Sequence, residues 1–142
     1  MSISRALADV IRATGGDPTE PAWEWLVLRG PHGEAFTWAQ TKNQAPGYVG
    51  VEHLEQIVTE RQDADPTFRS RARDVAKMAL SSTDIGLLRR GIQVAAVVGA
   101  EAELRRVVSL ANHENVAVVG DAKAGAFYLK RRLKRGEQKH DA

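Results

Sequence analysis

Between Asp84 and Leu129 the apolar residues recur every three or four positions, and polar residues fill the places between them. The first apolar face in this stretch consists of Leu88, Ile92, Ala95, Ala96 and Gly99. Such spacing places apolar side chains on one side of a helix. Asp84 is a good N-cap residue before this face, and Gly99 is typical of a helix end. The stretch therefore predicts three short helices in an antiparallel row.

The same reasoning predicts helices along most of the chain. The predicted helices cover residues 2–14, 51–61, 66–80, 84–98, 100–111 and 115–134. Pro66 is expected in the first turn of its helix, after Asp65, because proline suits that position. Residues 22–39 differ, since aromatic and branched side chains flank a Gly-Pro-His-Gly turn. That pattern predicts a small β-hairpin, and a short helix over 22–29 is the alternative.

An α/β fold is the rival interpretation of the central stretch. Residues 92–98 and 116–119 are apolar runs that end at a glycine, as buried parallel strands often do. Gly120 and Gly125 even have the spacing of a phosphate-binding loop, but Ala126 stands where that loop needs its lysine. No Gly-x-Gly-x-x-Gly motif is present. These departures favour the mainly α interpretation over a nucleotide-binding α/β enzyme.

The central helices resemble HEAT-like repeats, in which pairs of antiparallel helices stack into a solenoid. The residues that carry the resemblance are Asp84, Leu88, Arg89, Arg90, Ile92, Ala95 and Ala96. A weaker copy follows thirty residues later, at Glu114, Val118, Ala122 and Ala126. The resemblance implies a short HEAT-like solenoid, preceded by an N-terminal helix and the hairpin.

The chain has 142 residues, which fits one domain. We expect residues 1–50 to form an N-terminal extension, residues 51–135 to form the HEAT-like helices, and residues 136–142 to fray. The sequence has no cysteine and no apolar run long enough for a membrane span, and because its first residues lack the apolar run of a secretory leader we expect none. These features predict a cytoplasmic protein without disulfides.

Charge is unevenly distributed along the chain. Residues 130–142 hold six basic and two acidic residues, a net charge of +4, whereas the other 129 residues hold 14 basic and 16 acidic residues, a net charge of −2. The body of the protein is thus nearly neutral, which is not the composition of an obvious nucleic-acid-binding domain. The basic segment 130–139 is either a solvated helix end or a nucleic-acid contact. Phe127 and Tyr128 precede this segment and are not interleaved with its charges.

The sequence contains no recognisable catalytic or metal motif. The four histidines, His32, His53, His113 and His140, do not form a His-Glu-x-x-His motif or another metal-binding spacing. There is no Gly-x-Ser-x-Gly motif and no cysteine nucleophile. We therefore expect no catalytic residue, no cofactor and no bound metal, and we interpret His113 as a polar residue at a helix junction.

Two stripes of polar residues are the leading candidates for a binding surface. Arg69, Arg73 and Lys77 recur every four residues, opposite the apolar face of their helix. Arg105, Ser109 and Asn112 form a similar stripe, with Arg106 beside it. In a HEAT-like solenoid both stripes would line the concave side, where they could meet an acidic protein surface or a phosphate backbone. A solvated helix face is the competing interpretation.

Tryptophans of the predicted hairpin are a second candidate surface. Trp23 and Trp25 could anchor a partner, because aromatic residues dominate interface hot spots. The competing interpretation, which we favour, is that they cover the end of the helical core.

Short HEAT-like chains with their own N-terminal extension are similar to the immunity proteins of bacterial toxin systems, which dock on a toxin and block it. The resemblance therefore implies a non-enzymatic protein-binding module whose partner is a toxin domain with an acidic surface. HEAT-like DNA repair glycosylases offer the alternative of nucleic-acid binding through a basic surface and tail. We expect no membrane partner.

Overall fold

The computed structural model describes residues 5–20, 23 and 51–141, and the side chains of this set except those of 51–57 and 136–141. The described residues form six α-helices and a short 3-10 helix, and they contain no strand. The mainly α prediction is therefore confirmed. Residues 92–98 lie in a helix and residues 116–119 begin another, so the α/β alternative is wrong at the two segments that suggested it.

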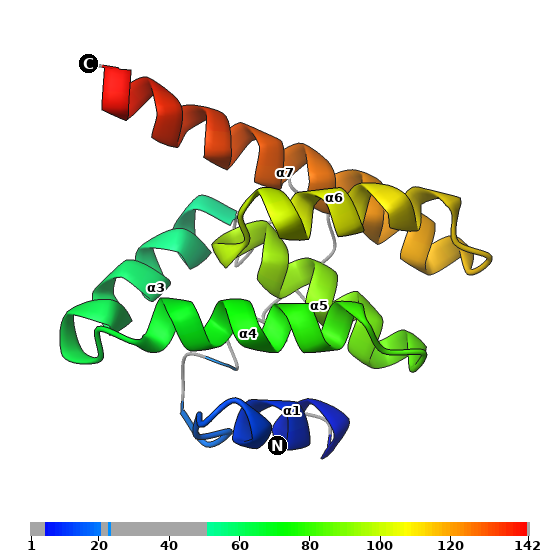
Figure 1. The fold of residues 1–142 in the computed structure, drawn as a ribbon, viewed down its shortest axis with the longest axis horizontal. Coiled ribbons are helices and arrows are strands. Elements are labelled where there is room, and N and C mark those ends of the chain that lie inside the picture. The colour runs from blue at the N-terminus through cyan, green and yellow to red at the C-terminus, as the bar shows by residue number, and fades with distance from the viewer. Residues whose placement is uncertain (1–4, 21–22, 24–50, 142) are drawn as a thin grey trace, which may run out of the picture.

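The helices lie close to their predicted positions (Figure 1). Their bounds are α1 (Arg5–Ala13), α3 (Val51–Ala64), α4 (Phe68–Leu80), α5 (Ile85–Val98), α6 (Glu101–Ser109), η2 (Leu110–Asn112) and α7 (Val116–Asp141). The largest difference is at the end of α7, which continues to Asp141 instead of ending near 134. The predicted hairpin falls outside the described residues, apart from Trp23.

Local hydrogen bonds explain where three of these helices begin. Asp84 accepts a hydrogen bond from the Leu87 N–H at 2.9 Å, as expected of the N-cap of α5. Asn115 caps α7 in the same way, through the N–H groups of Ala117 and Val118. Helix α4 begins later than predicted because the Asp65 carboxylate accepts hydrogen bonds from the Thr67 N–H and hydroxyl. This local turn holds residues 65–67 outside the helix.

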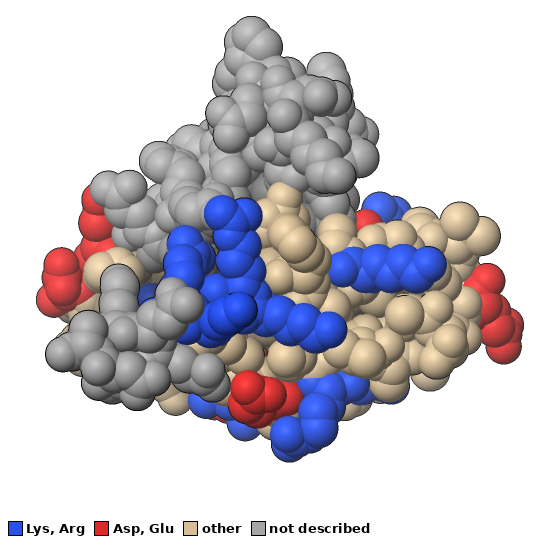
Figure 2. Space-filling view, turned by 90° about the horizontal axis from the view of Figure 1, so that it is seen from above, with Lys and Arg blue, Asp and Glu red and all other residues tan. Residues whose placement is uncertain are grey.

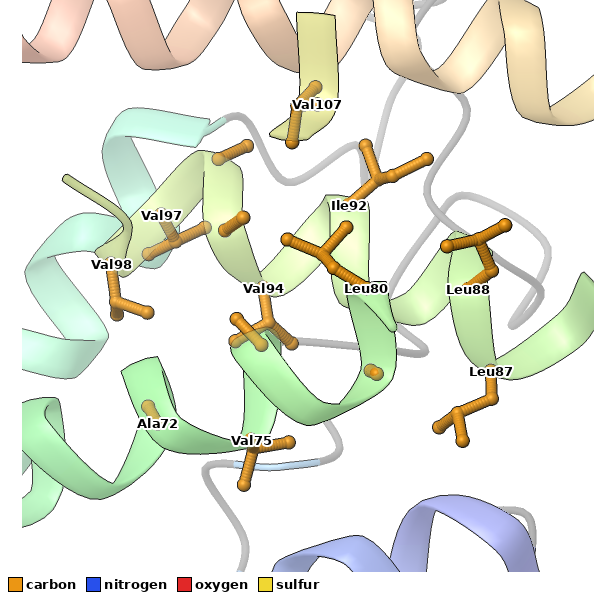
Figure 3. Close-up of a cluster of buried hydrophobic side chains, with 14 of the residues drawn as sticks. Ala72, Val75, Leu80, Leu87, Leu88, Ile92, Val94, Val97, Val98 and Val107 are labelled. Atoms are coloured by element: carbon orange, nitrogen blue, oxygen red, sulfur yellow. The ribbon is translucent and has the colours of Figure 1, made fainter. Parts of the chain in front are cut away.

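Helix α5 is the centre of the fold. Every residue from Leu87 to Gly99 is buried except Arg89 and Arg90, which are half-buried. Helices α1, α3, α4, α6 and α7 all contact α5. Figure 3 shows Ile92 pointing toward α6 and α7, and Leu87 pointing toward α1. The described helices thus surround α5, and this arrangement does not confirm the predicted solenoid row.

Two glycines allow neighbouring helices to approach α5 closely. A Cβ atom on Gly91 would lie 2.8 Å from the Ala79 Cβ atom and 3.0 Å from the Leu80 backbone nitrogen, both in α4. A Cβ atom on Gly125 of α7 would lie 2.7 Å from the Ile92 Cγ2 atom. Neither position has room for a larger side chain, so these glycines fix the packing of α4 and α7 against α5.

The N-terminal helix belongs to the same hydrophobic core. Leu7 and Ile11 of α1 are buried in one cluster with residues of every other described helix. Gly15 has a φ of +85°, a conformation that favours glycine, and it ends the turn after α1. Among the described residues, no helix combines the length and the apolar character needed to cross a membrane.

Candidate binding surface

The arginine stripe predicted on α4 is used largely for contacts inside the protein. Arg73 donates from Nε to the Oε1 atom of Glu103 on α6 at 2.9 Å, and its Nη2 atom forms an ion pair with the same oxygen, also at 2.9 Å. Glu103 is only 2% exposed, and the same oxygen accepts a hydrogen bond from the Ala100 N–H at 2.8 Å. Arg69 donates to the Gln62 side chain of α3 at 3.0 Å. The guanidinium groups of both arginines therefore join α4 to its neighbours.

The stripe predicted on α6 has a similar arrangement. Arg106 donates from Nε to the Leu80 carbonyl at the end of α4, at 3.0 Å, and from Nη1 to the Ser109 hydroxyl at 3.4 Å. The Ser109 hydroxyl in turn donates to the Arg106 carbonyl at 2.6 Å. Arg73 and Arg106 thus lie where α4 meets α6, as one surface would require, but the Nε atom of each already donates to a group inside the protein. Lys77, Arg105 and Arg106 are exposed. A partner-binding role for this stripe stays a prediction.

Trp23, the first of the two candidate tryptophans, lies in the hydrophobic core. Trp23 is 2% exposed, and its ring packs against Phe68 with centroids 5.6 Å apart. This position agrees with the core interpretation, because so deeply buried a ring presents almost no surface to a partner. Trp25 lies outside the described residues.

A half-buried charge cluster joins α5 to α7. Arg89 donates from Nε to Oδ2 of Asp121 at 2.6 Å. Burial raises the pKa of Asp121 above its ordinary value of 3.8, although the hydrogen bond from Arg89 opposes that shift. Burial also lowers the pKa of Arg90 beside it, with a contribution from the neighbouring charge of Arg89. Arg89 and Asp121 join α5 to α7 directly, so we assign the cluster to helix packing.

The outer face of α7 differs from all these sites, because its cations point into solvent. The exposed residues of α7 that recur every three or four positions form this face, which we call the α7 outer face: Val116, Gly120, Lys123, Phe127, Lys130, Arg131 and Lys134. Among the α7 side chains that the structure describes, which end at Arg135, this face holds four cations and no carboxylate. Figure 2, which views the molecule from the α7 side, shows Lys and Arg side chains gathered there.

An aromatic ring lies in the middle of these cations. Phe127 is 58% exposed, and it contacts the neighbouring Tyr128 ring edge to face, with centroids 5.3 Å apart. Lys123 lies one helical turn before Phe127, and Arg131 lies one turn after it. Phe127 precedes the basic segment 130–139 in the sequence, but on the surface of the helix it lies between Lys123 and Arg131. Consecutive residues of a helix point in different directions, whereas residues four apart are neighbours.

Arg132, the residue after Arg131 on α7, binds inside the protein instead of pointing into solvent. Arg132 is half-buried and donates from Nε to the Ala96 carbonyl at 3.3 Å, and from Nη2 to the Gly99 carbonyl. These carbonyls belong to the C-terminal end of α5, where a cation is favourable. Arg131 faces solvent while Arg132 stabilises the central helix, although the two are adjacent in sequence.

Other kinds of site find little support in the described part of the chain. It contains no group of three His, Asp or Glu side chains arranged to hold a metal ion. His113 accepts a hydrogen bond from the Asn115 N–H through Nδ1 at 3.0 Å, the junction role expected from the sequence.

Comparison with known proteins adds no relative. No family model, no curated protein and no solved structure matches the chain. The resemblance to HEAT-like repeats and to immunity proteins therefore stays a prediction, and the α7 outer face is the candidate binding surface on its geometry and charge.

Proposed function

We propose that the chain is a non-enzymatic binding module that docks an anionic macromolecule on the α7 outer face. The observation that carries this proposal is the set of four exposed cations, with no carboxylate among them, on one side of a helix. Like charges gathered on one face create a positive potential that attracts an anionic partner and orients it. An immunity protein that docks on an acidic toxin domain would be one member of this class.

The cations of the α7 outer face are accessible to a ligand, which distinguishes them from Arg73 and Arg106 in the stripes on α4 and α6. A ligand of Arg73 would have to compete with Glu103, which is almost completely buried, and a ligand of Arg106 with the Leu80 carbonyl. Leaving Glu103 buried without its partner would be unfavourable. Lys130 and Lys134 are exposed, so an anion can approach them without breaking a helix contact.

Two matched charge reversals test the proposal. The first variant combines Lys130→Glu and Lys134→Glu on the α7 outer face. The control combines Lys77→Glu and Arg105→Glu, which are exposed cations of the α4 and α6 stripes, so both variants change the net charge equally. Each protein is passed over immobilised heparin, a polyanion, and eluted with a salt gradient.

The α7 variant should elute at clearly lower salt than the unmodified protein, and the control should stay close to it. Equal elution of the two variants would overturn the proposal, because net charge alone would then govern binding. A loss confined to the Lys77 and Arg105 variant would instead return the site to the predicted stripe.

A further inference from the structure

We infer that the anionic partner is single-stranded nucleic acid, whose phosphates meet the cations of the α7 outer face while a base stacks on Phe127. This inference rests on the proposed function, because it names the partner of that same face. It depends on the position of Phe127 among the cations as well as on their charge.

The cations are distributed along the helix in a way that suits a linear chain of phosphates. With a rise of about 1.5 Å per residue, the path from Lys123 to Lys134 is about 16 Å long. One strand of a duplex carries a phosphate for about every 3.4 Å of its axis, so this length spans several phosphates. Cations lie on both sides of Phe127, so a strand that follows them must pass over its ring.

Phe127 is suited to receive a base. More than half of its surface is exposed, and the edge-to-face contact with Tyr128 restricts the orientations that its ring can adopt. Proteins that bind single strands combine a cationic path with aromatic side chains on which unpaired bases stack. The combination on α7 is a small version of that arrangement.

Other polyanions fit this face less well. In a duplex the bases are already stacked inside, so no base face is open to the Phe127 ring. An acidic protein surface would pair with the cations, but its carboxylates would make no stacking contact with the Phe127 ring. Only an unpaired strand offers both phosphates and exposed base faces.

Fluorescence anisotropy with a labelled oligothymidylate of about 15 nucleotides tests the inference, since single-strand sites cover about 4–16 nucleotides. Phe127→Leu keeps an apolar side chain but removes the aromatic face, and Phe127→Trp keeps it. The leucine variant should bind about 5- to 150-fold more weakly, and the tryptophan variant should bind as well as the unmodified protein. Thermal denaturation should show that both variants keep the fold, because the side chain is mostly exposed.

Salt dependence separates the two components of binding. Phe127→Leu should leave the slope of log affinity against log salt unchanged, whereas Lys130→Glu with Lys134→Glu should reduce it. A duplex of the same length and poly-glutamate serve as competitors. Preference for the duplex or for poly-glutamate over the single strand would overturn the inference, and so would equal affinity of the leucine variant and the unmodified protein.

The outcomes also separate this inference from the proposed function. If the α7 outer face governs heparin retention but the protein does not bind oligothymidylate, the inference fails and the proposed function stands. If heparin retention is independent of the α7 outer face, both fail.

Discussion

The α4–α6 contact and the α7 outer face hold the same kinds of side chain in opposite situations. At the α4–α6 contact, Arg73 and Arg106 end on a buried carboxylate and on a backbone carbonyl. On the α7 outer face, Lys123, Lys130 and Lys134 end in solvent. The difference teaches that the spacing of cations along a helix identifies a face, whereas the neighbouring helix decides whether that face is available to a partner.

The largest expected effect comes from removing the partner of Arg73. Glu103→Ala should lower the free energy of unfolding by about 2 kcal/mol, because it removes an ion pair and the cap on the Ala100 N–H. Arg73 is 35% exposed, so the loss should be smaller than the roughly 3–5 kcal/mol of a fully buried pair. Urea denaturation measures the change.

Glu101→Ala is the control for this variant, since Glu101 is an exposed acidic residue in the same first turn of α6. It should lose only the helix-dipole contribution, under about 1 kcal/mol. Equal losses for the two variants would mean that the α4–α6 contact contributes no more than surface charge does.

Two glycines of α7 sharpen the contrast between its faces. Gly120→Ala should raise the free energy of unfolding by about 0.5–1 kcal/mol, because alanine favours the helix and its Cβ atom would meet nothing within 4 Å. Gly125→Ala should lower it by about 1 kcal/mol or more, since its Cβ atom would clash with Ile92. Thermal and urea denaturation should show opposite signs, and changes of one sign would contradict this assignment of faces.

Adjacent arginines provide a smaller and sharper comparison. Arg132→Ala should cost about 1 kcal/mol of stability, because it removes the donors to the Ala96 and Gly99 carbonyls. Arg131→Ala should change stability by less than about 0.5 kcal/mol and should lower heparin retention. Reversed results in the two assays would exchange the roles of these residues.

The smallest effect concerns pH and the Asp121 cluster. Because burial raises the pKa of Asp121, the folded protein protonates this residue at a higher pH than the unfolded chain does. Its contribution to stability is therefore fully present below the unfolded pKa of 3.8 and is lost as pH rises through the folded pKa. Relative to an Asp121→Asn variant, the unmodified protein should be less stable at about pH 7 than at about pH 4. A constant difference in urea denaturation between these pH values would contradict the shift.

Local signals in the sequence predicted the helices well. Asp84 caps α5 as expected, Gly99 ends that helix, and the apolar periodicity places the described helices within a few residues of their observed bounds, except at the end of α7. The start of α4 was predicted two residues early, because the hydrogen bonds of Asp65 to Thr67 prevail over the preference of Pro66 for a first turn.

Long-range features could not be predicted in this way. Periodicity marked one apolar face of α5, but Gln93, Val94 and Val97 on its other sides are buried as well, because helices pack all round it. Arg73 and Glu103 are thirty residues apart, and no local pattern connects them. The sequence indicated only part of the α7 outer face, because the basic segment 130–139 begins at Lys130, whereas Lys123 and Phe127 of the same face lie before it on the helix.

The division of α7 into two faces also bears on engineering. Its inner residues are constrained by α5, whereas the seven outer positions can be exchanged at little cost to stability. A combinatorial library over those positions could therefore retarget the molecule while the surrounding helices keep their arrangement. In that use the protein is a compact scaffold that displays one variable helix face.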